Sequence, residues 1–316
     1  MINIQNKLTQ KAFAKINLIL KVLNKRPDNY HNIFTLMHKI SLHDAITILP
    51  NDNELYVECD VDLNIPMEEN IVYKTAKALL EYTNCERSAS IIIKKNIPIG
   101  AGLGGGSSDA ATTLLLLNQF WELKLSMGSL YKIAITLGSD VPFFLENYPK
   151  WIYGKGEHCK ILDIIEMDNR SKIKYKHIDA NAIVVYPKIH INTSEAYQKL
   201  NRTIEDIEVN YDSYLKRMMW VENEIDNNTN KFLRHKMVND FESVIFESYP
   251  EIEDIHKTLS SVSNGGARLT GSGSAVFALF IDKNKDVTMN YVKSQLKQKF
   301  KEEGKDYLVF RTTLVP

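Results

Sequence analysis

The sequence predicts an α+β protein of two domains. Its 316 residues are more than one compact core usually holds, and they suffice for two. Segments rich in Ile, Val and Leu, which are typical of strands, are interspersed with segments whose apolar residues recur at helical spacing. Apolar residues make up 44% of the chain, which is typical of a folded protein and too high for a disordered one.

The charge balance argues against polyanionic partners. Lys and Arg number 39 and Asp and Glu number 39, so the formal net charge is zero. We therefore expect neither nucleic acid nor an anionic membrane as partner, although a local basic pocket for one small anion is compatible with this balance. No apolar run reaches the roughly 18 residues of a membrane-spanning helix. Nothing in the sequence predicts the oligomeric state.

The cysteines and the N-terminus indicate a cytoplasmic protein. Cys59, Cys85 and Cys159 are odd in number, far apart and without a CxxC pair, so neither a disulfide framework nor a zinc site is expected. Residues 1–10 lack the apolar core of a secretory signal. Together these features favour a reducing compartment.

We expect a first domain over residues 1–155. Its predicted strands are 11–23, 33–40, 44–49 and 90–94, with a loop at 24–32 that contains Pro27 and Asn29. Helical spacing predicts helices over 70–84 and 107–121. Ser107 or Ser108 is the expected N-cap of the second helix.

A second domain is expected over residues 156–316. Residues 181–187 are a predicted strand that ends at a proline, and 192–200 a short helix capped by Thr193 or Ser194. The polar stretch 202–231 predicts helical pieces with an exposed, mobile linker. A Gly-Ser turn followed by an apolar strand is expected over 267–282, and a Lys-rich amphipathic helix over 286–303.

The strongest functional signal is a glycine-rich loop at 98–109. Five glycines in seven residues let successive backbone N–H groups converge on one point, and the loop leads directly into a helix. A helix N-terminus favours anions such as a triphosphate. The alternative is a turn that binds nothing. The pattern is neither a Walker A loop nor a Rossmann fingerprint. The predicted ATP-binding residues here are Pro98, Ile99, Gly100, Ala101, Gly102, Leu103, Gly104, Gly105, Gly106, Ser107 and Ser108.

Three blocks resemble the GHMP kinases, a family named for galactokinase, homoserine, mevalonate and phosphomevalonate kinases. They are Ala-Lys-Ile-Asn-Leu at 14–18, the loop 98–109, and Leu-Thr-Gly-Ser-Gly-Ser at 269–274, whose turn closes under the phosphate loop in that family. Their order and spacing match over nearly the whole chain. The resemblance implies the two-domain GHMP kinase fold, with an N-terminal nucleotide-binding α/β domain and a C-terminal ferredoxin-like α+β domain. It also implies ATP-dependent phosphorylation of an alcohol.

Four shorter segments narrow the resemblance within the family. They lie at 26–31, 104–109, 137–143 and 154–157. They are similar to the members that phosphorylate the 2-hydroxyl of a small molecule, cytidine diphosphate-linked methylerythritol, in the non-mevalonate isoprenoid pathway. The implied cofactors are ATP and Mg²⁺, with Mg²⁺ bound mainly through ATP and no metal ligands from the protein. The alternatives are a homoserine- or mevalonate-type kinase, or a non-catalytic sensor, which would be expected to lack the catalytic groups.

Two residues are candidates for catalysis. Asp140 precedes Val-Pro, a good helix start, so an ordinary N-cap is its alternative to a general base. Lys15 interrupts an apolar strand and needs a partner if it is buried, although it could equally point to water from an edge strand. The resemblance implies that Asp140 is the base and that Lys15 lies beside it and positions it with the reacting hydroxyl.

The remaining candidates concern the two ligands. By resemblance, Asn70 lies near the ATP adenine and Tyr197 stacks on cytosine. Tyr30 is expected to sandwich the ring with Tyr197, while His31 hydrogen-bonds its edge. The alternatives are that Tyr197 is a core aromatic and Lys95 a solvated charge. The full set of expected substrate contacts is Asn17, Tyr30, His31, Lys95, Thr193 and Tyr197.

Overall fold

The computed structural model describes residues 7–162, 165–167, 173–175, 178, 180–203, 211–264, 266–281 and 285–315. Its contacts divide the chain into two compact units. Unit 1 comprises the described parts of Met1–Ala14, Leu42–Ile99 and Gly104–Asn147, and unit 2 those of Lys15–Ser41, Gly100–Leu103 and Tyr148–Pro316. Neither unit is contiguous in sequence. The boundary expected between residues 155 and 156 stays a prediction.

Two long strands, β1 (Leu8–Lys25) and β2 (His31–Leu49), contribute residues to both units. The strand predicted at 11–23 is confirmed. The loop predicted at 24–32 is shorter than expected, because β1 continues to Lys25 and β2 begins at His31. The two strands predicted at 33–40 and 44–49 are wrong as separate elements, because β2 is continuous. Its length has a physical reason, since it pairs with β5 over Ile33–Met37 and with β4 over Ala45–Leu49. The sequence suggests a break between two strands at 41–43, where the side chains are half-exposed, but β2 continues through these residues.

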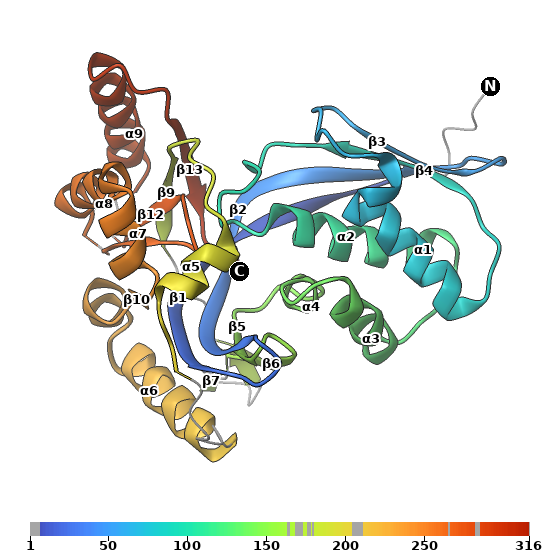
Figure 1. The fold of residues 1–316 in the computed structure, drawn as a ribbon, viewed down its shortest axis with the longest axis horizontal. Coiled ribbons are helices and arrows are strands. Elements are labelled where there is room, and N and C mark those ends of the chain that lie inside the picture. The colour runs from blue at the N-terminus through green and yellow to red at the C-terminus, as the bar shows by residue number, and fades with distance from the viewer. Residues whose placement is uncertain are drawn as a thin grey trace. The chain divides into compact units, whose positions relative to one another are not determined.

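Unit 1 places a layer of helices beside a sheet. Strands β2, β4 (Ala89–Lys94) and β3 (Leu55–Cys59) are consecutive neighbours, and β3 runs parallel to β4. Helices α1 (Ile71–Thr83) and α2 (Gly105–Phe120) lie side by side (Figure 1). The short η2 (Met67–Glu69) precedes α1, while α3 (Met127–Leu137) and α4 (Val141–Phe144) pack against α2. The elements predicted at 70–84 and 90–94 are confirmed.

The start of α2 differs from the prediction. The helix begins two residues earlier than expected, and its N-cap is Gly104 rather than Ser107 or Ser108. Gly104 has a φ of 71°, a left-handed conformation that glycine adopts without steric cost. No side chain caps α2 in the described structure. The first backbone N–H groups of α2 are thus left for water or a ligand.

In its described residues, unit 2 contains part of a seven-stranded sheet, a four-stranded sheet and a two-stranded sheet. The first has β10 (Val238–Asn239) parallel to β1, then β2, β5 (Lys150–Gly154) and β6 (His158–Ile161). The second is antiparallel in the order β11 (Ala267–Leu269), β12 (Val276–Phe280), β9 (Asn181–Tyr186) and β13 (Leu308–Thr313). Strands β7 (Ile165–Met167) and β8 (Ile173–Tyr175) pair with each other.

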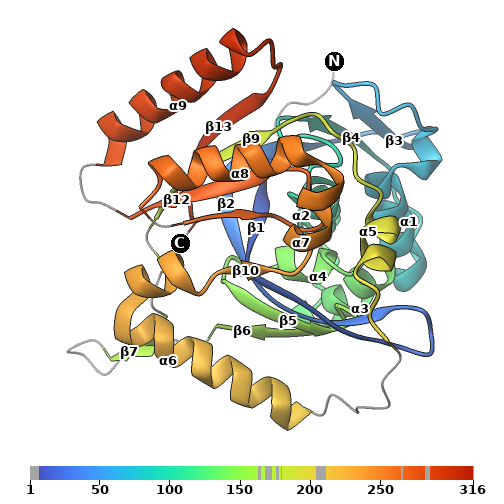
Figure 2. The same ribbon diagram turned by 60° about the vertical axis from the view of Figure 1, so that its left-hand side comes forward.

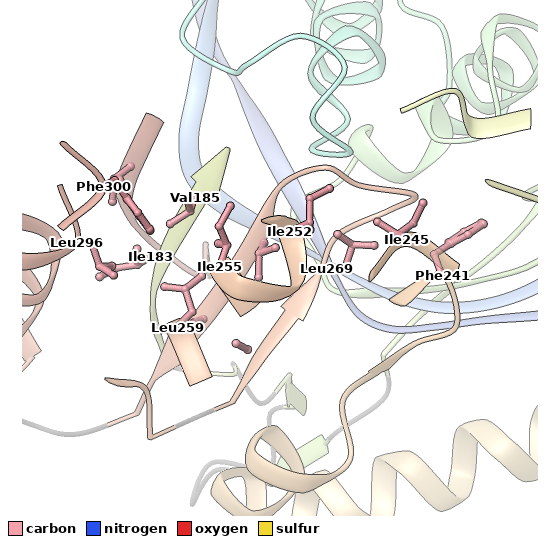
Figure 3. Packing of buried hydrophobic residues seen from close by; sticks show 14 of the residues in the cluster. Ile183, Val185, Phe241, Ile245, Ile252, Ile255, Leu259, Leu269, Leu296 and Phe300 are labelled. Atoms are coloured by element: carbon pink, nitrogen blue, oxygen red, sulfur yellow. The ribbon is translucent and has the colours of Figure 1, made fainter. Parts of the chain in front are cut away.

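Helices cover the second sheet and enclose the core of unit 2. Helix α8 (Pro250–Val262) packs on β12 and α9 (Lys285–Glu302) on β13 (Figure 2). Ile252, Ile255 and Leu259 line one face of α8 and point into a cluster that includes Ile183 and Val185 of β9 (Figure 3). Burial of this apolar surface is the main term that stabilises the layer. The elements predicted at 181–187, 267–282 and 286–303 are confirmed.

Two predictions in unit 2 need correction. Helix α5 (Thr193–Lys199) is capped by Asn192, whose Oδ1 accepts from the N–H groups of Ser194 and Glu195, and not by Thr193 or Ser194. The stretch 211–231 is no linker, because it belongs to one helix, α6 (Tyr211–His235). A buried apolar face that includes Met218 and Ile225 outweighs the weak helix propensity of its asparagines. Residues 204–210 lie outside the described residues. The short helix α7 (Glu242–Ser248) follows β10.

Two expected absences can be compared with the described part of the chain. Within the described ranges, no helix combines the length and the apolar character that a membrane crossing requires. The three cysteines, all of which are described, form no disulfide.

Candidate active site

The side chain of Asn17 is the centre of a buried polar network on β1. Its Oδ1 accepts from Lys15 Nζ at 2.7 Å, from Gly271 N at 2.9 Å and from Thr270 Oγ1 at 3.2 Å. Its Nδ2 donates to Thr35 Oγ1 at 2.8 Å. Asn17 is 1% exposed and Lys15 3% exposed, so these bonds form away from water. Lys15 does not point to water from an edge strand, and the predicted contact of Asn17 with the substrate stays a prediction.

The turn after β11 packs tightly against the first half of the glycine-rich loop. A Cβ atom at Gly102 would lie 2.2 Å from the carbonyl oxygen of Thr270, and one at Gly271 would lie 3.1 Å from the carbonyl oxygen of Gly102. Both glycines have positive φ. Backbone bonds from Lys15 N to Leu103 O and from Ala275 N to Ala101 O complete the contact. Parts of all three sequence blocks, those at 15–18, 100–103 and 269–274, therefore meet within unit 2.

The second half of the loop forms the first turn of α2 in unit 1. Gly105 faces inward, because a Cβ there would lie 3.0 Å from Ile97 Cγ2 and 3.4 Å from Lys95 Nζ. Gly106 is exposed, and among the described residues a Cβ there would meet Ile71 Cγ2 at 3.8 Å, an ordinary van der Waals distance. Open room beside backbone N–H groups at a helix N-terminus suits a phosphate group.

Lys95 lies in a buried ion cluster of unit 1. Its Nζ donates to Asp44 Oδ2 at 2.5 Å and to Asp109 Oδ2 at 2.7 Å. Asp44 Oδ1 also accepts from the N–H groups of Asn96 and Ile97. The ammonium group of Lys95 is therefore buried rather than solvated, and its described ion pairs are with two carboxylates of the same unit. Its predicted contact with the substrate stays a prediction.

The cluster has one more carboxylate than it has ammonium groups. Burial raises the pKa of Asp109 to about 7, against the lowering effect of Lys95 and with a further raising effect of Asp44. Asp109 Oδ1 is buried and has no hydrogen-bond partner among the described residues, whereas Asp44 accepts two backbone bonds. Asp109 is therefore the group of the cluster whose pKa lies near neutral pH, and its protonation relieves the surplus negative charge.

An aromatic pair joins the start of β2 to helix α5. The rings of His31 and Tyr197 stack at 4.9 Å with an interplanar angle of 19°, and Phe241 meets Tyr197 edge-on at 4.9 Å. Burial lowers the pKa of His31, and the positive charges of Lys25 and Arg202 lower it further. A neutral imidazole offers one donor and one acceptor, which suits the edge of a nucleobase.

The other predicted ligand contacts fall in varied settings. Tyr30 is 62% exposed, with Lys155 Nζ 5.3 Å from its ring centroid, so the ring described against Tyr197 is that of His31 and not Tyr30. Thr193 shares a hydrogen bond with Ser272 across 2.9 Å. Asn70 caps α1, where its Oδ1 accepts from Val72 N.

Asp140 occupies the N-cap position of α4, with Pro142 in the first turn. Its side chain makes no capping hydrogen bond, so the ordinary-cap alternative does not account for the carboxylate. Asp140 belongs to unit 1 and Lys15 to unit 2, and each is described within its own unit. Their expected pairing stays a prediction.

The comparisons with known proteins place the chain in a family. The model of the GHMP kinases N terminal domain matches residues 70–147, and that of the GHMP kinases C terminal matches 215–301. The 4-diphosphocytidyl-2-C-methyl-D-erythritol kinase of Syntrophus aciditrophicus is 37% identical over 86% of this chain and 89% of its own length. The enzyme of the same name from Thermodesulfovibrio yellowstonii is 38% identical over 87% and 90%. The chain belongs to the GHMP kinase family.

Solved structures agree with this assignment. A crystal structure of a 4-(cytidine 5'-diphospho)-2C-methyl-D-erythritol kinase covers 98% of this chain and all of its own, with a TM-score of 0.72 and 27% identity. Homoserine kinase from Cytophaga hutchinsonii also has a TM-score of 0.72, over 100% of this chain and 97% of its own. Its identity is only 16%, so it shows the GHMP kinase fold alone.

Sequence reasoning missed several residues of the buried polar networks in the two units. Thr35, Asn239 and the carboxylates Asp44 and Asp109 were not singled out, although each is buried and polar. Asp109 is the last residue of the glycine-rich segment 98–109, but the sequence assigns it no role. Thr35 and Asp44 lie on β2 and carry no local pattern, so their partners could be found only in the fold.

We predict that replacing Asp109 by Asn changes the pH dependence of stability. The folded pKa of about 7 exceeds the ordinary value of 3.8. The native state therefore holds the extra proton between these values, and the wild type loses stability as pH rises through this window. Asn cannot titrate, so the free energy of unfolding of Asp109→Asn relative to the wild type should rise with pH, by up to about 1.4 kcal/mol per pH unit.

Urea unfolding at pH 5, 6, 7 and 8 measures this difference. Asp62→Asn is the matched control, because Asp62 is an exposed carboxylate of the same unit. Its difference from the wild type should vary little over this range. A difference for Asp109→Asn that is equally flat would show that Asp109 is ionised throughout.

Proposed function

We propose that the protein transfers the γ-phosphate of ATP to the 2-hydroxyl of 4-diphosphocytidyl-2-C-methyl-D-erythritol, a step of the non-mevalonate isoprenoid pathway. The observation that carries the proposal is the identity of 37–38% with kinases named for this substrate, over most of both chains. The open first turn of α2 and the His31–Tyr197 pair offer places for a phosphate and a base. The cytoplasm remains the expected compartment.

The rival functions have weaker support. The structures of a homoserine kinase and a mevalonate kinase share the fold of this chain. Their sequence identity to it is 16%, which carries no information on the substrate. A non-catalytic sensor would have no need of Lys15 and Asp140, which are both present. An assay that offers the diphosphocytidyl substrate, homoserine and mevalonate separately as phosphate acceptors distinguishes the proposed function from both rivals. A non-catalytic sensor would phosphorylate none of them.

ATP is the phosphate donor implied by the kinase family, and the loop 98–108 is its proposed binding segment. Gly106 leaves room for a phosphate beside the amides of the first turn of α2, and Ser107 and Ser108 add hydroxyl groups there. Mg²⁺ would be held mainly by the phosphates, where it neutralises their charge. Among the described residues no group of three or more His, Cys, Asp or Glu side chains forms a metal site. Asn70 is proposed to lie near the adenine.

The chemistry requires an acceptor for the hydroxyl proton. As the hydroxyl oxygen attacks the γ-phosphorus and the bond to ADP breaks, the proton passes to Asp140 in this proposal. Lys15 supplies a fixed positive charge, and Asn17 holds its ammonium group in place. On the substrate side, we propose that Tyr197 stacks on cytosine and that neutral His31 contacts its edge, with Tyr30, Lys95 and Thr193 as further contacts.

We predict that Asp140→Asn lowers kcat by roughly 10²–10⁴-fold, because general-base catalysis contributes about that much. The affinity for ATP should change little, since the carboxylate acts on the acceptor. Steady-state kinetics and calorimetry measure the two quantities. Asp52→Asn, an exposed carboxylate of the same unit, should retain wild-type kcat. A near-normal kcat in Asp140→Asn would remove Asp140 from the mechanism.

Base selection gives a second test of the proposal. Stacking contributes about 1–3 kcal/mol without choosing a base, so discrimination must come from hydrogen bonds to the base edge. The uridine analogue should therefore be a poor substrate, by about 10⁴-fold in kcat/KM if the site leaves a polar group unpaired. Tyr197→Ala should raise KM for the cytidine substrate without relaxing the preference for cytidine over uridine. His31→Ala should raise KM and also relax this preference.

Comparison of kcat/KM for the cytidine and uridine substrates in each variant decides this prediction. Tyr291→Ala is the control, because that ring is 64% exposed on α9. Equal use of both bases by the wild type would contradict the proposed cytosine site.

A further inference from the structure

A four-residue corner at 239–242, between β10 and α7, holds the turn that follows β11. Asn239 Nδ2 donates to the carbonyl oxygens of Leu269 at 2.8 Å and of Gly271 at 2.9 Å. Its Oδ1 accepts from Phe241 N at 3.0 Å. Asn239 is buried, and these bonds use both donors and the acceptor of its amide. The side chain is therefore set in one orientation.

Two acidic side chains of the corner add further hydrogen bonds and an ion pair to these contacts. Glu242 Oε1 accepts from Leu269 N at 2.9 Å, so the peptide groups on both sides of Leu269 are bonded to the corner. Asp240 Oδ2 accepts from Val22 N at 3.0 Å, and its Oδ1 pairs with Lys21 Nζ at 2.8 Å. The corner thus fixes the turn relative to β1, the strand that carries Lys15 and Asn17.

Gly271 connects the corner to the candidate catalytic lysine. Its carbonyl oxygen accepts from Asn239, while its N–H donates to Asn17 Oδ1, the atom that also accepts from Lys15 Nζ. A Cβ at Gly271 would lie 3.4 Å from Lys15 Nζ and 3.1 Å from the carbonyl oxygen of Gly102. A shift of this turn therefore displaces the partners of both Lys15 and the loop.

We infer that Asn239 is a positioning residue for phosphoryl transfer, which acts on Lys15 through Gly271 and Asn17. The inference rests on the proposed function. Positioning matters because a misplacement of about 1 Å in a reacting constellation costs on the order of 10²-fold in rate. The alternative is a corner that only stabilises the fold, in which case its loss would lower stability and leave the folded enzyme with normal kcat.

The test uses the full-length protein with ATP and the diphosphocytidyl substrate. Asn239→Ala should lower kcat by roughly 10–10²-fold, with KM for the nucleotide-linked substrate changed less than about threefold, because the aromatic pair is intact. Asn264→Ala is the matched control. Its Oδ1 also accepts a backbone N–H, that of Ile281 at 3.0 Å, and Asn264 precedes β11 whereas the 269–271 turn lies at the other end of that strand. Asn264→Ala should retain kcat within about twofold.

A double-mutant cycle makes the connection specific. If Asn239 and Asn17 act through the same turn, Asn17→Ala/Asn239→Ala should lose less activity than the product of the two single losses. Losses that multiply, or an Asn239→Ala enzyme with the kcat of the control, would overturn the inference.

Two further outcomes keep the test decisive. If Asn239→Ala does not fold, Asn239→Asp removes the Nδ2 donor to Leu269 and Gly271 at nearly constant volume and keeps an acceptor for Phe241 N, and a normal kcat in that variant would overturn the inference. A wild type that fails to phosphorylate the diphosphocytidyl substrate would instead contradict the proposed function, independently of any variant.

Discussion

The organisation of unit 2 depends on one oxygen atom, Oδ1 of Asn17. It accepts from the ammonium group of Lys15, the backbone of Gly271 and the hydroxyl of Thr270, all in a water-excluded environment. A buried ammonium group is tolerated only with such partners, and a buried amide costs free energy unless its polar atoms are bonded. This requirement links β1 to the turn after β11. The same turn contacts Gly102, so the loop conformation and the lysine position are set together.

Charge is handled differently in the two units. In unit 1, Lys95 is held by two carboxylates at the start of α2, and the surplus negative charge is relieved when Asp109 is protonated. In unit 2, Lys15 Nζ donates to the neutral amide oxygen of Asn17, which orients the ammonium group. The side chain of Lys95 is thus held by two carboxylates, and that of Lys15 is oriented within a buried polar network.

The sequence predicted the elements whose signal is local. The loop 98–109, helix α1 and the strands β4, β9 and β12 each have a periodicity or a turn pattern of their own. Predictions failed where a distant partner decides, as for the continuous β2, which is held by β5 and β4, and for α6, whose apolar face outweighs its asparagines. The caps Gly104 and Asn192 were missed by one to four residues, because several neighbouring residues can cap a helix. Asn239 gave no signal, since its partners are about 30 residues away in the chain.

The comparison of Asn17→Asp with Asn17→Ala tests this account most directly. The three groups bonded to Oδ1 are all donors, so a carboxylate can accept from each of them, whereas alanine accepts from none. Steady-state kcat of Asn17→Asp should lie within about tenfold of the wild type, and that of Asn17→Ala should fall by about 10²-fold. If Asn17→Asp is as impaired as Asn17→Ala while both are folded, an acceptor at this position does not suffice, and the account of Asn17 Oδ1 as the organising atom is contradicted.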